Sequence, residues 1–517
     1  MTPDIPIAPP QESTVATVQQ VSAGESATLR VESHGYIYIV SGNTVLTTDR
    51  IRSLLDSAVD PKAAVEALNQ AYQDAGYFLV SIRGQVQDRQ VVITVVQGRV
   101  TELDVTPSLL GFFEGVQGDE TLTRNDVLRH AALAESYAAR EGKRPKASFA
   151  PAGDFGGSRL TVTEEDVPDA SPWNASLGFG NYGNRYSSRF LAQGAAAWRP
   201  GAGLEVNANY SQGLPSLSDE SRGSRYQGGG AGISWVTPYG VYGASFSHTL
   251  YRIGEAARPL NPEGDILTWS VSGSQLVFAD ANSRWIFNEG FTRTDYTVTV
   301  FDRFFTLTDQ KYDFINLGTT YSRSLQVFGK SATLSASASW MNGLSSREGT
   351  FVFDGAGSPD PNFTIWQWGL GYTQDLPAGF RFGVNLSGQE ASATLPQNQQ
   401  WVLGGFGNLT AWYPGVLIGD SGVLLRASVA APSWSWDRIE MNGGMFVEGG
   451  SARTHFTLPG QPEVRRLADV GVSLGARWDK HAGATMAVAV PLWRDNIDKR
   501  VVDAERVHLY FSLNFDL

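Results

Sequence analysis

The sequence predicts two small α/β modules followed by an all-β, 16-stranded antiparallel transmembrane barrel. Three observations carry this prediction. Helical spacing of apolar residues is confined to the first third of the chain. From Trp173 onward apolar and polar residues alternate with a period of two, the pattern of strands with one apolar face and one polar face. The connections between these strands are alternately short and long, as in outer-membrane barrels.

The composition excludes several classes of protein. The chain has 517 residues, no cysteine and a formal net charge of −12. Without cysteine there is no disulfide scaffold, no Cys-based zinc site, no iron–sulfur cluster and no cysteine nucleophile. No run of about 18 apolar residues occurs, so no transmembrane helix is expected. The acidic balance disfavours a nucleic-acid partner.

Residues 1–34 are predicted to be an N-terminal tail or linker, because their first 28 residues are rich in Pro, Ser, Thr and Gln. The opening MTPDIPIAPPQES has neither a basic start nor an apolar stretch. Since the rest of the chain has the pattern of an exported protein, we expect this sequence to be a mature form whose export signal has been removed.

Residues 35–100 form the first predicted module, in the order strand, helix, helix, strand, strand. A short apolar strand covers 36–40. Thr47 is an N-cap signal for the first helix, and Asp60 followed by Pro61 is one for the second. Further strands are expected at 77–86, 91–96 and 100–105.

Residues 101–166 form a second module with a similar but less clear order. A helix is expected over 124–140, and strands over 146–150 and 158–163. Nothing in either module indicates catalysis. The acidic, Pro-containing segment 164–172 is predicted to mark the boundary with the barrel, which takes residues 167–517.

Sixteen segments of the barrel region alternate. In the last of them Leu509, Phe511 and Leu513 share one face, and polar residues share the other. The predicted strands are 173–183, 187–198, 202–212, 226–236, 240–252, 265–279, 283–297, 310–325, 330–341, 363–375, 379–390, 422–431, 439–450, 464–479, 482–492 and 505–517.

The connections distinguish a barrel from a soluble β-sandwich. Most connections after even-numbered strands have two to four residues, whereas those after odd-numbered strands, the first excepted, are long. A sheet in a membrane must close so that no edge N–H or C=O group faces lipid. Its apolar face then points outward and its polar face lines the lumen. A sandwich would bury the apolar face and needs no asymmetry of loops.

Two such modules before a 16-stranded barrel resemble the outer-membrane transporters of two-partner secretion, the TpsB family, in the superfamily of BamA and TamA. Residues 35–100 look like the first POTRA domain of that family, through 42–46, 72–77 and 95–100, and residues 101–166 look like the second, through 150–158. The segments 446–450, 470–475 and 490–492 resemble the last strands of such transporters.

The most specific resemblance lies in the long loop 391–421. In the family this sixth extracellular loop folds back into the lumen, and its tip carries Val-Arg-Gly-Tyr or Val-Arg-Gly-Phe. The flanking elements of the family are present here, but the tip has Thr in place of the arginine and Ala in place of the glycine. The tip residues are Asn408, Leu409, Thr410, Ala411 and Trp412, and the flanking residues are Gly404, Gly405, Gly419, Asp420 and Gly422.

The resemblance implies an acidic partner for the missing arginine on strand 13, where this chain has Glu448. A buried glutamate without a guanidinium partner is costly unless another donor serves it. Two substitutes are available, the guanidinium of Arg426 and the hydroxyl of Thr410. We therefore expect the loop to lie in the lumen and to be held mainly by packing of Leu409 and Trp412.

The resemblance implies that the POTRA domains capture an exported, TpsA-like partner polypeptide in the periplasm and that the barrel secretes it across the outer membrane. One alternative is an assembly or insertion factor of the same superfamily, or a specialised export barrel for another polymer, because a lost tip signature is typical of a specialised branch. The modules and the loop disfavour a passive porin. Many relatives have an N-terminal helix that plugs the pore, but residues 1–30 carry little helical signal, so we expect none.

An enzyme is not expected. The six histidines are scattered without metal-ligand spacing, and no nucleophile–base constellation is evident. We expect no catalytic residue, no cofactor and no metal, and we expect a monomer surrounded by outer-membrane lipid.

Overall fold

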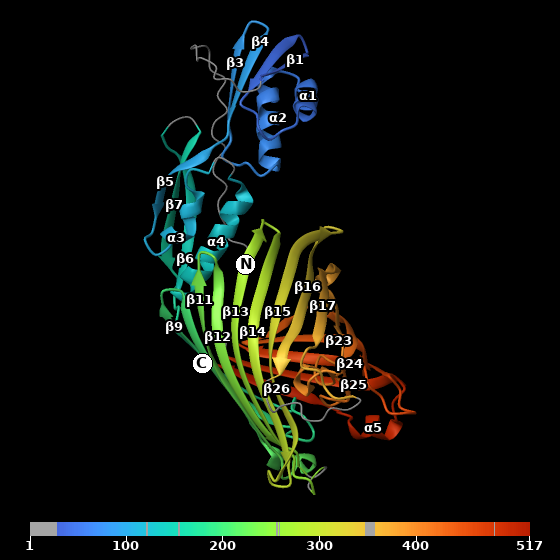
Figure 1. Cartoon of the computed structure of the whole chain (residues 1–517). Helices are drawn as coiled ribbons and strands as arrows, with labels where there is room; N and C mark the ends of the chain where they lie inside the picture. The colour runs from blue at the N-terminus through green and yellow to red at the C-terminus, as the bar shows by residue number, and fades with distance from the viewer. Residues whose placement is uncertain are drawn as a thin grey trace. The chain divides into compact units, whose positions relative to one another are not determined.

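The structure is a computed structural model that describes residues 28–119, 122–153, 156–254, 257, 259–346, 357–479 and 481–517. The expectation that residues 1–30 contain no plug helix falls almost entirely outside these residues. The chain divides into two compact units, one made of residues up to 170 together with 278–281, and the other of the remaining residues (Figure 1). In the part of the chain that is described, no helix is both long and apolar enough to cross a membrane.

The first α/β module packs two helices on a four-stranded sheet of order β1-β2-β4-β3. Its elements are β1 (Leu29–Ser33), β2 (Tyr36–Ser41), α1 (Thr48–Ser57), α2 (Pro61–Asp74), β3 (Ser81–Gln87) and β4 (Gln90–Val96). The Asp60 side chain caps α2 by accepting from the N–H of Ala63 at 2.7 Å. Tyr38, Leu55 and Leu68 are fully buried between the helices and the sheet.

One part of the predicted tail is structured. Residues 29–33, assigned above to the tail 1–34, form β1, which pairs antiparallel with β2. The short hairpin between them turns at His34 and Gly35, both with positive φ. The alternating LRVES segment was too short and too polar to be recognised as a strand, and its pairing with β2 is what orders it.

The second module has a three-stranded sheet of order β5-β7-β6, in which β5 and β7 are parallel. Its elements are β5 (Arg99–Val105), α3 (Leu110–Phe113), η1 (Glu114–Val116), α4 (Arg124–Arg140), β6 (Lys143–Pro151) and β7 (Gly157–Asp166). Thr123 and Asp126 form a capping box at the start of α4. Both modules have the strands and helices of POTRA domains.

The barrel prediction is confirmed. In the described residues sixteen strands form one closed antiparallel sheet, in which β22 continues β21 after a short break. The strands are β8 (Trp173–Gly180), β9 (Leu191–Gly201), β10 (Leu204–Gly213), β11 (Arg225–Thr237), β12 (Gly240–Arg252), β13 (Glu263–Ala279), β14 (Ser283–Val300), β15 (Phe305–Val327), β16 (Lys330–Ser346), β17 (Thr364–Asp375), β18 (Arg381–Ala391), β21 (Ser421–Ala430), β22 (Trp434–Trp436), β23 (Ile439–Arg453), β24 (Val464–Trp478), β25 (Ala482–Asp495) and β26 (Tyr510–Asp516).

The connections between the strands contain short helices and strands, and the predicted start of the last barrel strand is corrected. They include η2 (Pro215–Leu217), η3 (Asp219–Ser221), η5 (Pro377–Gly379), η6 (Gln397–Gln399), a hairpin of β19 (Trp401–Leu403) and β20 (Leu417–Gly419), and α5 (Lys499–Ala504). The last strand begins at Tyr510, whereas the alternation predicted a strand from residue 505. Residues 505–507 alternate like a strand, but they bond to the loop 391–421 instead of to a barrel neighbour.

The two faces of the barrel strands differ as predicted. On β23, Met445 is 63% exposed and Val447 is also exposed, whereas Phe446 and Glu448 between them are buried. Since successive side chains of a strand point to opposite faces, Glu448 points into the barrel. The ring closes where β26 pairs with β8 over Ser176–Gly180.

Candidate functional site

The loop 391–421 connects β18 to β21 and carries the β19–β20 hairpin at its centre. Two flanking glycines are required by its geometry. Gly404 and Gly405 have φ angles of 113° and 104°, a region that is strained for any other residue. A Cβ at Gly404 would also collide with the carbonyl oxygen of Tyr413. The N–H of Gly405 donates to the carbonyl of Trp412 at 2.8 Å, which closes the base of the tip.

The tip is buried against the inner wall of β23–β26. Leu409, Ala411 and Trp412 have no exposed surface, and Thr410 has almost none. Asn408 is only partly buried, and its amide nitrogen reaches the carbonyl of Val402 at 3.3 Å. The tip packs against Phe446, Ala452, Leu467, Ala487, Ala489, Val507 and Tyr510. The expected packing of Leu409 and Trp412 is therefore present.

Three charged side chains form a row across the inner wall. Arg426 on β21 lies opposite Glu448 on β23, and Glu448 lies opposite Asp469 on β24. The guanidinium of Arg426 donates to Glu448 Oε1 and stacks over the ring of Phe446, 4.4 Å from its centroid. Arg426 thus takes the place of the missing tip arginine from a neighbouring strand.

The tip binds this row through its backbone. The N–H of Thr410 donates to Glu448 Oε2 at 2.6 Å, and the N–H of Ala411 donates to Asp469 Oδ2 at 2.7 Å. The Thr410 hydroxyl accepts from the N–H of Gly407 at 3.0 Å, and the contact of Thr410 with Glu448 in the described residues runs through its backbone N–H. Two consecutive amides can bind two carboxylates here because Leu409 is left-handed, with φ of 64°.

Asp469 is the functional candidate that the sequence did not reveal. It has no exposed surface, as Glu448 has almost none. The available signal was its place on the polar face of the strand 464–479. Only the strand register shows that this polar position lies beside Glu448. Buried carboxylates are costly unless charge and hydrogen bonds compensate them, so this row depends on Arg426 and on the docked tip together.

A second set of bonds fastens the tip to the segment before β26. The N–H of Val507 donates to the carbonyl of Ala411 at 2.8 Å, and the N–H of Tyr413 donates to the carbonyl of Glu505 at 2.9 Å. The hydroxyl of Tyr510 donates to the carbonyl of Trp412 at 2.8 Å. The tip is therefore held between β23 and β24 on one side and the start of β26 on the other.

The C-terminal flank of the loop is an anchor at its own base. Asp420 is buried, and its two carboxylate oxygens accept from the N–H groups of Leu395 and His455, each at 2.8 Å. A side chain at Gly419 would meet the backbone of Arg453, and one at Gly422 would meet the ring of Trp401. These flanking residues therefore position the loop, whereas the tip binds the row of charged side chains.

The loop crosses the lumen. Its N-terminal part contacts β14 and β15, where Tyr296 donates to Gln397 at 2.6 Å and Tyr312 donates to Asn398. Its tip accepts from Tyr510 on β26. Counted along the chain, β15 and β26 are the eighth and sixteenth strands of the closed sheet. A segment bonded to walls half a ring apart must span the space between them.

In the described residues no group of three or more His, Asp or Glu side chains is arranged to hold a metal ion. The His455 ring contacts the carbonyl of Ala391 at 2.8 Å, and the His130 ring contacts the carbonyl of Phe112 at 2.7 Å.

Similar proteins share this architecture. CdiB from Escherichia coli has a solved structure that aligns with 97% of this chain and 93% of its own, with a TM-score of 0.75 and 18% identity. CdiB from Acinetobacter baumannii aligns with 100% of this chain and 94% of its own, with a TM-score of 0.69 and 15% identity. At these identities the likeness shows the fold.

Sequence comparisons lead to a family. The heme/hemopexin transporter protein HuxB of Haemophilus influenzae is 22% identical over 365 residues, which cover 67% of this chain and 60% of HuxB. The family model described as haemolysin secretion/activation protein ShlB/FhaC/HecB matches residues 156–478, which is more than half of the chain. The chain therefore belongs to the haemolysin secretion/activation protein family ShlB/FhaC/HecB.

Proposed function

We propose that this chain is a two-partner secretion transporter, which captures an exported partner polypeptide with its N-terminal modules and passes it through the barrel. The observation that carries the proposal is the loop that crosses the lumen. A passive pore needs no such segment, whereas a translocase needs a barrier that closes the path when no client is present. The loop is held by hydrogen bonds and packing without any covalent link, so a client can displace it.

The modules suit the capture of an extended chain. In this proposal residues 35–100 and 101–166 are POTRA domains, both lie in the periplasm, and each binds client at an open sheet edge. The four-stranded sheet ends in β1 and β3, and the three-stranded sheet ends in β5 and β6. An extended peptide adds a strand to such an edge through main-chain hydrogen bonds. The relative HuxB is named a heme/hemopexin transporter, which supports transport as the activity.

The transporter is proposed to act as a monomer in outer-membrane lipid. The ring is closed within one chain, so no second copy is needed to complete the barrel. No catalytic, cofactor or metal chemistry is part of the proposal, because threading an unfolded chain requires a path and a receptor only.

The test starts from the genes that neighbour the gene for this chain, among which we expect one for a large exported protein, and it measures secretion of that partner. Cells that produce both proteins are expected to release the partner into the medium, and cells without this chain are expected to keep it in the periplasm. A variant that lacks β1–β4 should retain the barrel and lose secretion. Equal release with and without the chain would contradict the proposal.

The second candidate is an assembly or insertion factor for outer-membrane proteins. The observation that favours it is the short pairing between the first and last strands of the barrel. β26 pairs with β8 over only five residues, whereas β23 and β24 pair over fifteen. Two strands that pair over so few residues can separate and open the barrel wall toward lipid. Depletion of the chain would then lower the amount of folded barrel proteins in the outer membrane, while secretion of the partner would be unaffected.

A further inference from the structure

A cluster of charged side chains lies on the outer face of the barrel at the end with the long loops. Arg225 begins β11, Arg252 ends β12 and Glu263 begins β13. Ile233 on β11 and Trp269 on β13 are about half exposed, which identifies the outward face of these strands. Residues an even number of positions apart share a face, so Arg225 and Glu263 also point away from the lumen.

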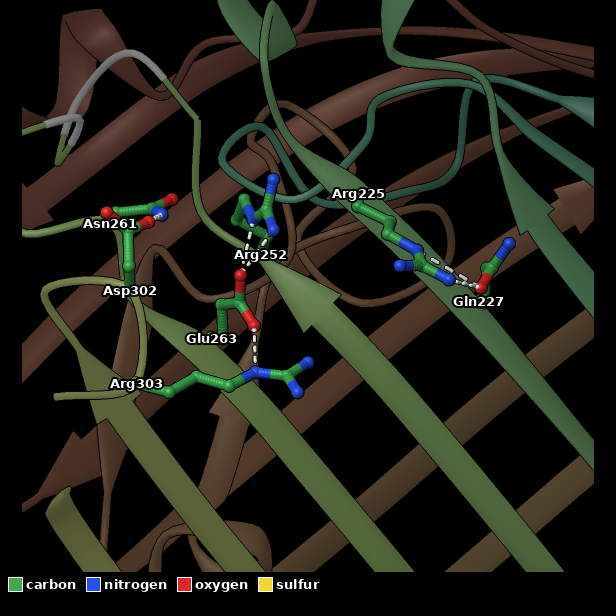
Figure 2. A network of polar contacts seen from close by, with 7 residues as sticks. All are labelled: Arg225, Gln227, Arg252, Asn261, Glu263, Asp302 and Arg303. Carbon is green, nitrogen blue, oxygen red and sulfur yellow. Dashed lines mark hydrogen bonds and ion pairs between the residues drawn. The ribbon is translucent and has the colours of Figure 1, made fainter.

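One carboxylate holds two arginines in this cluster. Glu263 accepts from Arg252 Nε and from Arg303 Nε, each at 2.8 Å, and Figure 2 shows the two guanidinium groups approaching it from opposite sides. Arg303 belongs to the turn between β14 and β15, where Phe301, Asp302 and Arg303 all have positive φ. A bond of 2.5 Å from Asn261 Nδ2 to Asp302 Oδ1 fastens this turn to the neighbouring loop (Figure 2).

The cluster carries more positive than negative charge. Arg225 lies directly opposite Arg252 in the strand register, and like charges at such positions repel. In the described part of the chain Arg225 has no carboxylate partner, and its Nε donates to Gln227 at 3.1 Å instead. The nearby Asp265 is paired with His248 at 2.8 Å. Three guanidinium groups therefore share this site with two carboxylates, Glu263 and Asp265, and the remaining excess of positive charge favours an anion.

A cavity of about 270 Å³ lies among these arginines, and Thr297 and Thr299 are among the residues that line it. The Thr297 hydroxyl donates to Asp309 at 3.5 Å, which leaves the Thr299 hydroxyl as the further donor. Guanidinium groups bind phosphate oxygens through paired, charge-assisted hydrogen bonds, and hydroxyl groups add further donors. The cavity therefore has the chemistry of a phosphate site.

An apolar groove lies on the same outward faces of β11–β14. It has a volume of about 700 Å³ and is lined by Ile233, Phe246, Trp269, Val271 and Phe291 among others. Phe246 and Trp269 are in ring contact, with centroids 4.5 Å apart. Arg252 lies six positions after Phe246 on β12, which corresponds to roughly 20 Å of extended chain. A polar head at the arginines and acyl chains on the groove fit an amphiphile of this length.

We propose that this wall binds a phosphorylated glycolipid of the outer leaflet, with its phosphates at Arg225, Arg252 and Arg303 and its acyl chains on the groove. In outer-membrane barrels the long loops are extracellular, so the arginines lie at the level of outer-leaflet head groups. Glycerophospholipids of the inner leaflet would meet the opposite end, at the short turns. The inference rests on the outer-membrane location and does not depend on polypeptide export.

The experiment measures lipid retention by the purified full chain in detergent, using native mass spectrometry. The probes are lipid A with two phosphates, lipid A with one phosphate, and phosphatidylglycerol. The variant is Arg225→Gln combined with Arg303→Gln. The matched control is Arg381→Gln, since Arg381 forms an exposed ion pair with Asp375 at the short-turn end. Heat-modifiable migration in SDS gels confirms that each variant has a folded barrel.

We expect the wild type and the control to bind two-phosphate lipid A equally and the double variant to bind it about tenfold or more weakly. Loss of one phosphate from the lipid should weaken binding to the wild type and have little effect on the variant. Equal affinity of the variant and the wild type would overturn the inference. Binding of phosphatidylglycerol as tight as that of two-phosphate lipid A would overturn the assignment to the glycolipid.

Discussion

The row formed by Arg426, Glu448 and Asp469 can be tested for its role in holding the loop. The substitution is Glu448→Gln. Glu448 uses its two oxygens differently, since Oε1 accepts from Arg426 and Oε2 accepts from the N–H of Thr410. A glutamine has one oxygen and one NH₂ group. Whichever way its amide turns, the NH₂ group faces another donor.

The expected cost follows from this mismatch. The substitution removes one charge-assisted hydrogen bond of residue 448, which costs about 2–3 kcal/mol. If this cost falls on the docked loop, its release becomes about 30- to 150-fold more frequent. The barrel wall, with its complete backbone ladder, should remain folded.

Because the chain has no cysteine, a single introduced thiol can be labelled without background. Ala411→Cys introduces a single thiol at a position with no exposed surface, so a maleimide reacts only when the tip leaves the wall. The labelling rate of this thiol should rise about 30- to 150-fold when Glu448→Gln is added. An unchanged rate would refute the role of Glu448 in holding the loop.

A second substitution supplies the control. Arg426→Gln in the Glu448→Gln background provides an amide oxygen for the new NH₂ group, so the glutamine introduced at position 448 can again offer its own oxygen to Thr410. The double variant should label more slowly than Glu448→Gln alone, with a coupling of about 1–2 kcal/mol. Additive effects of the two substitutions would show that the residues do not act as a pair.

Three further predictions concern the loop 391–421 and the second module. Trp412→Ala removes the largest fully buried side chain of the described residues and about 3–5 kcal/mol of packing free energy. Ion conductance in planar bilayers should therefore increase. Unchanged conductance and secretion would count against a docked loop. Gly404→Ala should also raise conductance while heat-modifiable migration of the barrel stays normal, because its φ of 113° is strained for alanine; wild-type conductance would contradict this. Burial lowers the pKa of His130, whose Nδ1 lies 2.7 Å from the carbonyl of Phe112. The unfolded chain therefore binds the proton more readily, so the second module should lose stability as the pH falls below the ordinary histidine value of about 6.5. Faster hydrogen exchange in α4 at pH 5 than at pH 7 would show this, and His130→Gln should remove the pH dependence.

The barrel could be predicted from the chain because lipid imposes a local rule on every strand. One face must be apolar and the other need not be, so each strand carries its own signal without reference to its neighbours. The helices of the modules were visible for the same kind of reason, since the cap at Asp60 acts within a single turn. Segment 505–507 shows the limit of this logic, because it alternates like a strand and yet bonds to the loop tip.

The contacts that hold the loop tip against the wall could not be predicted in the same way. The residues that make them are remote in the chain and meet only through the register of neighbouring strands. Glu448 and Arg426 were recognisable as candidates, whereas Asp469 became one only when β24 was placed beside β23. The bonds from the backbone N–H groups of Thr410 and Ala411 to the two carboxylates leave no trace in residue identity, since every residue except proline has an N–H group. Alternation along each strand thus specifies a membrane barrel, while the alignment of one strand against the next decides which buried charges meet and what holds the loop across the lumen.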